Sequence, residues 1–173
     1  MNTKTDTPSL LNDQIHAFIG MKSPIVEAPD SVEEGAVRRY AQAIMDDDAI
    51  FSAQFGHRAP ALFPMHMFRR AFGSPDPLAE VEKNPDYDGA IGSSIRGLPD
   101  LPFKGKTRLN GGAEIEVFRY ADHGDRIKMQ SEYIEIKERV SKTGPMLIVV
   151  VETRYFTNPE DMILCVRSTA LYR

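Results

Sequence analysis

The chain has 173 residues, of which 42% are hydrophobic and 27% charged, and its formal net charge is −4. This length and composition are ordinary for one globular domain with a sizeable core. The slight acidic excess excludes the basic field that gathers nucleic acid, so we expect no nucleic-acid partner. The longest apolar run, 146–151, is far too short to cross a bilayer, so we expect no membrane partner.

Two further features bear on location. Residues 1–8 are polar and lack the apolar centre of a signal peptide, and we expect them to be frayed. Cys165 is the only cysteine, so no disulfide can form within the chain. It lies in the apolar run 162–166, which favours a buried structural thiol. A reducing cytoplasm fits these features best.

The first third of the chain predicts helices. Residues 10–20 can form a short helix that stops at a glycine, and 24–26 a first strand. The tetrapeptide at 31–34, Ser-Val-Glu-Glu, fits a capping box in which Ser31 caps and Glu34 reaches back. Apolar residues then recur at helical spacing until three consecutive aspartates end the helix.

A second helix is expected after the alanine- and proline-rich connector 59–64. Pro64 suits its first turn, and this helix, near 64–72, is the element that we expect a sheet to wrap. Its apolar side would be formed by Met65, Met67, Phe68 and Phe72. The segment 73–106 is rich in Gly, Pro and Asp, and a loop of this length is more often functional or interface-forming than idle.

The last third alternates in the manner of strands. Successive side chains of a strand point to opposite faces, and Ile134 and Ile136 have even numbers whereas Ile127 and Met129 have odd ones. One extra residue near 131–133 would place all four on the same face. The sequence therefore predicts a β-bulge there. Helices followed by long antiparallel strands predict an α+β fold. Further strands are expected at 114–117, 146–155 and 162–172.

Three stretches resemble the MaoC-like dehydratase family: 40–51, 59–64, and the set 109–119, 124–127, 143–147 and 152–153. The resemblance covers roughly 18–173 and is closest to the N-terminal-type domain, also described as the fatty-acid-synthase-like dehydratase domain. It implies a single hot-dog domain at 18–173, in which a long antiparallel sheet wraps a central helix and pairs into a double hot dog. Residues 1–17 would be a flexible or short-helical extension.

The resemblance also defines what is missing. In catalytic relatives an Asp opens the turn after the first long helix, and a His follows five residues later. Asp46 matches that Asp, but Phe51 stands where the His belongs. Phe51 can neither donate nor accept a proton, and hydration of an enoyl thioester needs both steps. Pro64 lacks an N–H near the start of the central helix, where catalytic relatives hold the thioester oxygen.

Paired members of this family hydrate trans-2-enoyl-CoA or dehydrate 3-hydroxyacyl thioesters, and related heteromeric hydratases act on bulky acyl groups, including steroid side chains. The resemblance therefore implies a non-catalytic, acyl-accommodating subunit. Its partners would be acyl-CoA and a small catalytic MaoC-like subunit, in a dimer or heterotetramer. No metal or other cofactor is expected, because no carboxylate or cysteine pattern accompanies the histidines.

The candidate site residues have competing interpretations. Asp46, His57 and His66 are the weak candidates for acid–base catalysis, and a solvated helix end or a structural hydrogen bond is the alternative for each. The apolar side chains of Phe51, Phe55, Leu62 and Phe63 could line an acyl tunnel or be plain core. A basic rim for CoA phosphates would draw on Arg69 and Arg70, with Arg96, Lys104, Lys106 and Arg108 also available.

Two other functions stay open at this point. One is a self-sufficient homodimeric hot-dog hydratase or thioesterase that uses Asp46 with His57 or His66. The other is a non-enzymatic module that binds acyl thioesters. Activity of the purified chain would favour the first, and binding without turnover under any pairing would favour the second.

Overall fold

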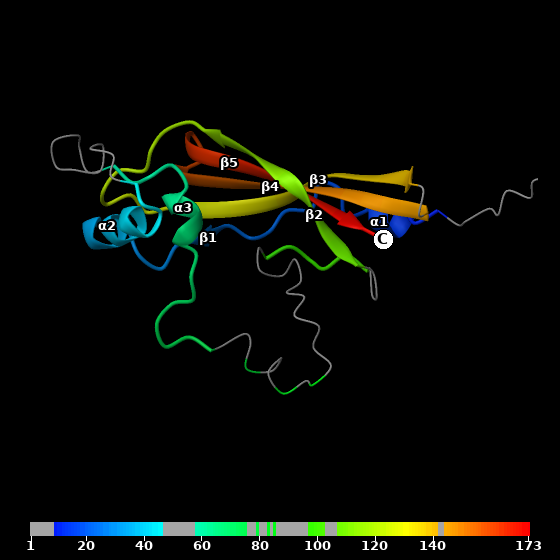
Figure 1. The fold of residues 1–173 in the computed structure, drawn as a ribbon, viewed down its shortest axis with the longest axis horizontal. Coiled ribbons are helices and arrows are strands. Elements are labelled where there is room, and N and C mark those ends of the chain that lie inside the picture. Colours follow the sequence, from blue (N-terminus) through cyan, green and yellow to red (C-terminus); the bar gives the residue numbers. More distant parts are fainter. Residues whose placement is uncertain are drawn as a thin grey trace, which may run out of the picture.

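The computed structural model of the protein describes residues 9–46, 58–75, 79, 83, 85, 97–102, 107–141 and 144–173. In this part of the chain, helices accompany one five-stranded antiparallel sheet of strand order β1-β3-β4-β5-β2 (Figure 1). The predicted α+β class is confirmed. The strands are β1 (Val26–Glu27), β2 (Arg108–Val117), β3 (Lys128–Ser141), β4 (Gly144–Asn158) and β5 (Asp161–Tyr172). The helices are α1 (Asp13–His16), α2 (Glu34–Ala43) and α3 (Phe63–His66).

The three longest strands form a meander in which β4 is central. Consecutive strands pair up to their adjoining ends, since Ser141 pairs with Gly144 and Asn158 pairs with Asp161. The predicted bulge is confirmed, because the β3–β4 register shifts between Tyr133 and Glu135 and leaves one extra residue there. The bulge restores the parity, so that the side chains on both sides of it face the same core.

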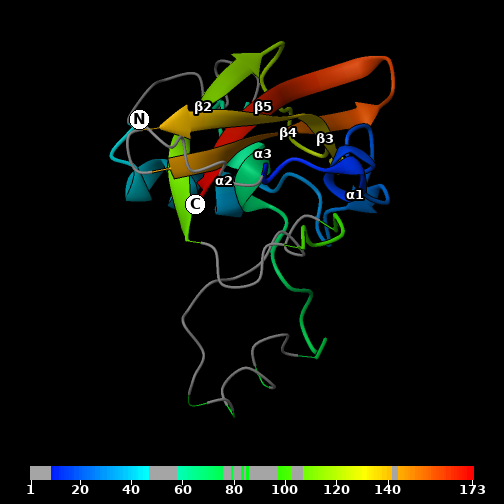
Figure 2. The same ribbon diagram turned by 90° about the vertical axis from the view of Figure 1, so that its right-hand side faces the viewer.

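The core lies on one face of the sheet, which we call the inner face. The helices pack on this face, with α2 and α3 at one end and α1 at the other (Figures 1 and 2). Two buried clusters lie beneath them. The cluster under α2 and α3 comprises Val32, Val37, Ala59, Phe63, Ala121, Ile127, Met129, Tyr155, Ile163, Leu164 and Val166. The cluster near α1 comprises Ile15, Leu98, Tyr133, Ile136, Leu147 and Val149.

The expected central helix at 64–72 is much shorter than predicted. α3 is a single turn, and the N–H of Arg69 donates to the carbonyl of Met67 at 2.9 Å instead of continuing a helical ladder. This turn lets Phe68 leave the helix and pack edge-on against Tyr155, with ring centroids 5.5 Å apart. Phe72, expected on the apolar side of the helix, is fully exposed.

The predicted capping box is also wrong. The N-cap of α2 is Glu33 and not Ser31; its backbone is extended, and it makes no side-chain capping hydrogen bond. The reason is tertiary: the N–H of Val32 donates to Asp125 O, and its carbonyl accepts from Gly124 N, both at 2.9 Å. These bonds hold the chain before α2 in an extended form, with Val32 fully buried.

At the N-terminal side, the predicted helix at 10–20 is a four-residue helix. Asn12 caps α1, since its Oδ1 accepts from the N–H of Ile15 at 3.0 Å. The chain does turn at Gly20, where φ is +85°, a conformation that suits glycine. The first strand, expected at 24–26, is the short β1.

Candidate functional site

Asp46, the first predicted site residue, lies directly after α2. Its N–H donates to Ala41 O at 2.9 Å, and the N–H of Met45 donates to Gln42 O at 3.2 Å. This is the Schellman pattern of helix termination. The residue in the left-handed position is Met45, with φ of 55°, where glycine is usual. The backbone of Asp46 is therefore fixed by the helix end, at the cost of a strained residue beside it. Phe51, Phe55 and His57 lie outside the described residues.

The start of α3 is the second region of interest, because free helical N–H groups there could bind a developing oxyanion. The N–H of Phe63 donates to Pro60 O at 2.9 Å, and the N–H of Met65 donates to Leu62 O at 3.1 Å. Pro64 lies between them and has no N–H. The first three positions of α3 therefore offer no donor to a substrate.

Three of the predicted site residues come together beside α2. Phe63, His66 and Arg69 line a pocket of about 470 Å³, together with Tyr40 and Arg39 of α2. Arg69 Nη2 lies 3.1 Å from His66 Nδ1, so this nitrogen accepts and Nε2 carries the proton. Burial, and then the charge of Arg69, lower the pKa of His66. The Nδ1 of His66 is thus occupied, and the imidazole is harder to protonate than that of an ordinary histidine.

The remaining predicted residues near α3 differ in exposure. Phe63 is buried in the core cluster under α2, where its ring lies 5.5 Å from that of Tyr40. Leu62 is partly exposed at the N-cap of α3, and Arg70 is exposed. Asp46 is not among the residues that line the pocket of His66. The described residues thus give no direct pairing of Asp46 with that imidazole.

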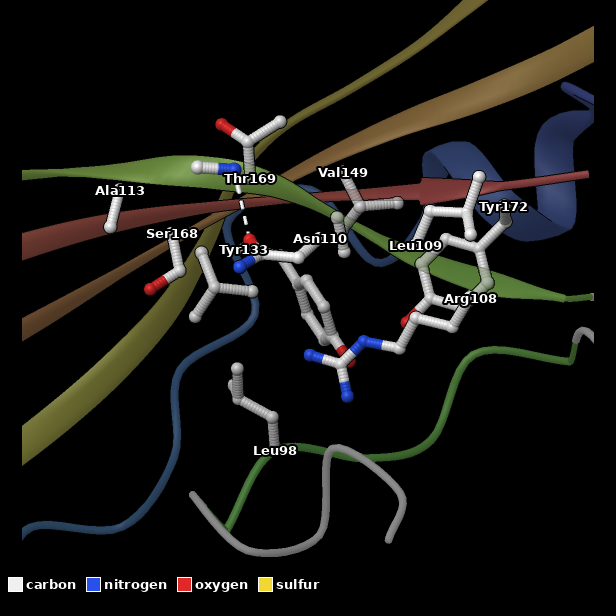
Figure 3. Close-up of a pocket in the computed structure, with 13 residues that line it drawn as sticks. Leu98, Arg108, Leu109, Asn110, Ala113, Tyr133, Val149, Ser168, Thr169 and Tyr172 are labelled. Carbon is white, nitrogen blue, oxygen red and sulfur yellow. Dashed lines mark hydrogen bonds between the residues drawn. The ribbon is translucent and has the colours of Figure 1, made fainter. Parts of the chain in front are cut away.

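A second pocket was not found by sequence reasoning. It has a volume of about 490 Å³ and lies on the inner face, between strands and the segment that carries Leu98 (Figure 3). Four neighbouring strands contribute to it, because paired residues on adjacent strands face the same side. The residues that line it are Leu98, Arg108, Leu109, Asn110, Gly112, Ala113, Tyr133, Val149, Val151, Ser168, Thr169, Ala170 and Tyr172.

Small residues create this space. Ala113 pairs with Ser168, and Ala170 pairs with Asn110, so short side chains meet across β2 and β5. A bulge between Asn110 and Gly112 adds to the irregularity, and Asn110 Oδ1 accepts from the N–H of Gly112 at 2.9 Å (Figure 3). A Cβ on the intervening Gly111 would lie 2.8 Å from a methyl of Thr169, so the two strands need glycine there.

A hydrogen bond from Tyr133 helps to position the segment that covers the pocket. The hydroxyl of Tyr133 donates to the carbonyl of Pro99 at 2.9 Å, which fixes Leu98 over the sheet. Because α3 is a single turn near the other end of the sheet, it does not line this pocket. A pocket of this size, lined by both apolar and polar side chains, is in the size range of small-molecule sites.

The described residues contain no group of three or more His, Cys, Asp or Glu side chains suited to a metal ion. In the same part of the chain, no helix is long and apolar enough to cross a membrane.

Comparisons with known proteins decide the family. Residues 17–165 match the FAS1-like dehydratase domain region. The chain belongs to the FAS1-like dehydratase family. This confirms the resemblance to MaoC-like dehydratases seen in the sequence. No curated protein sequence matches the chain.

Solved structures show the same fold at low sequence identity. The ChsH1–ChsH2 complex from Mycobacterium tuberculosis matches with a TM-score of 0.61 and 17% identity, over 91% of this chain and 86% of that chain. The HadBC (3R)-hydroxyacyl-ACP dehydratase complex from Mycobacterium tuberculosis matches with a TM-score of 0.55 and 15% identity, over 89% of this chain and 96% of that chain. A MaoC-like dehydratase from Rhodospirillum rubrum matches with a TM-score of 0.51 and 15% identity, over 88% of this chain and 90% of that chain. This FAS1-like dehydratase domain therefore has the hot-dog fold, with an open sheet and the single-turn helix α3 against it.

Proposed function

We propose that this chain is the non-catalytic, acyl-accommodating subunit of a heteromeric enoyl-CoA hydratase or 3-hydroxyacyl-thioester dehydratase. A second MaoC-like chain supplies the Asp and His that transfer protons. The substrates are acyl thioesters with bulky acyl groups, of which steroid side chains are one example. The family assignment supports hydratase-type chemistry, and the division of labour is our inference.

The observation that carries this proposal is the hydrogen bonding at the start of α3. An oxyanion hole needs donors aimed at the thioester oxygen, and removing one donor typically costs about 10²–10³-fold in rate. Here Pro64 has no N–H, and the N–H groups of Phe63 and Met65 are bonded to carbonyls of the preceding turn. Together with Phe51 in place of the expected His, this leaves the chain without two parts of the catalytic apparatus.

The inner-face pocket supports the accommodating role. A full central helix would cover the inner face of the sheet, whereas α3 ends at His66. The space of about 490 Å³ that opens beside β2 and β5 is lined by apolar side chains such as Leu98, Val149 and Val151 together with several polar ones. An aliphatic or polycyclic acyl group gains free energy there by leaving water, at roughly 25 cal/mol for each Å² buried.

The edge of the sheet supports a partner chain. β2 is an edge strand in the described sheet, and all ten of its residues are exposed. It carries Ile115 and Val117, each more than 40% exposed, and the exposed Phe118 follows it. A long exposed edge strand is a template for pairing with another chain. The ChsH1–ChsH2 and HadBC structures, which share the fold, are themselves complexes of two proteins.

The decisive experiment is reconstitution. The chain is co-expressed with a small MaoC-like protein that has an intact Asp–His pair, and the hydration of trans-2-enoyl-CoA substrates of graded size is followed by absorbance. We expect the complex to hydrate bulky substrates and the isolated chain to be slower by at least about 10², since it lacks an acid–base partner. Robust turnover by the pure chain, abolished by His57→Ala or His66→Ala, would establish the self-sufficient enzyme instead. Binding without turnover in every pairing would establish a binding module.

A further inference from the structure

The edge strand β2 differs between its two faces along its regular part, residues 112–117. Ile115 pairs with Val166 and Val117 pairs with Leu164, so both apolar side chains lie on the inner face, beside the core. They are 43% and 41% exposed, and no strand of the described residues pairs with the free side of β2. A chain that adds a strand there covers both side chains and hydrogen-bonds to the free backbone groups.

The opposite face of the same segment, which we call the outer face, is acidic. Glu114 and Glu116 alternate with the two apolar residues, and both are exposed. The cross-strand neighbour of Glu114 is Arg167 of β5, whose Nε donates to Glu152 of β4 at 2.8 Å. The sign of the charge therefore alternates across three neighbouring strands, from Glu152 to Arg167 to Glu114. A cation on the next strand would continue this alternation.

The two carboxylates of β2 are solvated in the isolated chain, and their effect arises when another strand pairs with them. Suppose that two copies of this chain pair antiparallel about a two-fold axis. A register centred on residue 114, 115 or 116 then places a glutamate directly opposite a glutamate, with Cβ atoms about 4.5–5.5 Å apart, where like charges are destabilising. A register centred on residue 113 or 117 still leaves two carboxylates as diagonal neighbours, at roughly 7–8 Å. Symmetric pairing through this segment therefore always brings like charges together.

We propose that β2 is an assembly edge that disfavours a second copy of this chain and selects a different chain, whose edge strand carries lysine or arginine opposite Glu114 and Glu116. On the inner face that strand carries apolar residues, which contact Ile115 and Val117. This inference rests on the proposed function, in which a second MaoC-like chain completes the enzyme, and it gives the chemistry by which that chain is recognised. The backbone of β2 can hydrogen-bond to any strand, so the side chains determine the choice of partner.

The first test uses a charge-reversed copy of the full chain as the basic strand. The double variant Glu114→Lys, Glu116→Lys keeps the apolar side of β2. By sedimentation velocity, we expect an equimolar mixture of this variant with the native chain to form a 1:1 dimer at least about tenfold more tightly than either chain dimerises alone, because like charges across the interface become opposite ones. Added salt should weaken the mixed dimer. The control Asp30→Lys, Glu160→Lys makes the same change of net charge at exposed positions away from β2, and should form no such dimer with the native chain.

The second test measures the affinity of the full chain for the small MaoC-like protein of the reconstituted complex by isothermal titration calorimetry. The charge-reversed variant should bind at least about tenfold more weakly than the native chain, and Glu114→Gln, Glu116→Gln should bind with intermediate affinity. The glutamine variant tests the charge without placing a cation beside Arg167. Neither position lines the inner-face pocket, so the preference among acyl groups should not change.

The outcomes separate this inference from the proposed function. A native dimer as tight as the mixed dimer, or a mixed dimer that the control variant forms equally well, overturns the selection by charge. A complex that hydrates enoyl-CoA but whose affinity neither β2 variant changes overturns it as well, and leaves the acyl-accommodating function standing. If the mixed dimer forms as expected but no MaoC-like protein gives hydration with this chain, the proposed function fails while the charge selection at β2 stands.

Discussion

Arg119 donates hydrogen bonds to both carboxylate oxygens of Asp161: its Nε lies 2.7 Å from Oδ1, and its Nη2 lies 2.6 Å from Oδ2. Its Nη1 donates to Asp125 at 2.8 Å, so one guanidinium ties the start of β5 to the loop between β2 and β3. That loop in turn holds the segment before α3, because the N–H of Ala59 donates to Ala121 O at 2.8 Å. The position of α3 on the sheet therefore depends on the ion pairs that Arg119 makes with Asp161 and Asp125.

The ion pair between Arg119 and Asp161 makes the free energy of unfolding depend on pH. The hydrogen bond from Arg119, helped by one from Thr157, lowers the pKa of Asp161 to about 2, from an ordinary 3.8. The unfolded chain thus takes up this proton at a higher pH than the folded chain does. The contribution of Asp161 is complete above about pH 4 and is lost as the pH falls toward about 2.

Asp161→Asn should therefore lower stability near neutral pH, with a difference from the native chain that disappears near pH 2. The carboxylate is 37% exposed, so solvent screening limits the loss to about 1 kcal/mol. For a chain of this size that corresponds to roughly 2–4 °C in the melting temperature. Thermal unfolding at a series of pH values measures this loss. The control is Asp122→Asn, which should change the melting temperature little, because the Asp122 side chain is 53% exposed and its carboxylate lies 3.9 Å from Arg119. A deficit in Asp161→Asn that persisted at pH 2 would refute this account.

The strained end of α2 predicts a stabilising substitution. Met45 has φ of 55° and is 90% exposed, so its side chain adds little packing to offset the strain. Met45→Gly should raise stability by about 0.5–1 kcal/mol, because glycine adopts this conformation without a Cβ clash. Urea denaturation measures the change. Met45→Ala keeps the Cβ and should show no such gain; an equal gain in both variants would mean that the side chain and not the backbone is responsible.

Cys165 should be chemically inert in the folded chain. The structure buries it on β5, as the sequence predicted, and burial, followed by the charge of Glu152, raises the pKa of its thiol to about 11. The thiolate is the reactive form, so labelling with a maleimide near neutral pH should be very slow until the chain is denatured. Mass spectrometry under native and denaturing conditions tests this, and complete labelling of the native chain within minutes would contradict it.

The features that sequence reasoning predicted well are those set by local alternation. The bulge follows from the parity of Ile127, Met129 and Ile136 alone, and the β4–β5 hairpin follows from apolar runs around a turn. The features that it missed depend on contacts between distant segments. The backbone of Val32 is hydrogen-bonded to residues 124 and 125, and this contact keeps the chain extended where the capping box was predicted. Phe68 packs on Tyr155, and the expected long helix ends early.

The inner-face pocket could not be read from the chain for the same reason. Ala113, Ser168 and Ala170 are unremarkable residues in the sequence, and they form a cavity only once β2 pairs with β5 in this register. A search for small residues at matching positions of neighbouring strands would have been the signal, but it requires knowing which strands are neighbours. The α3 N–H groups were partly predictable, because Pro64 stands in the sequence, whereas the bonds of Phe63 and Met65 are structural facts.

Restoring the missing histidine should not restore an enzyme. Phe51→His supplies an imidazole, yet the first three positions of α3 still offer no N–H to the thioester oxygen. We expect the hydration of crotonyl-CoA by the purified Phe51→His chain to stay near background, since the oxyanion contribution of about 10²–10³-fold would still be absent. The same substitution in the reconstituted complex should leave its turnover of crotonyl-CoA within about threefold of the native complex, because under the proposed division of labour the Asp–His pair of the partner transfers the protons. Full activity of the single variant alone would show that α3 is not the limiting element.

The last prediction concerns the size of the acyl group. Ala113 faces the pocket, and Ala113→Leu adds three carbons to a space that short side chains keep open. Long and polycyclic acyl groups should then bind at least about tenfold more weakly, since about 1.4 kcal/mol of lost contact or added strain suffices. Crotonyl-CoA, whose acyl group is too short to reach far along the sheet, should be hydrated by the reconstituted complex at nearly the native rate. Glu114→Leu places the same side chain one residue along the strand, on the opposite face, and should leave acyl preference unchanged. Competition between short and long enoyl-CoA substrates measures the ratio directly. If Ala113→Leu slowed all acyl lengths equally, the pocket would not be where the acyl tail lies.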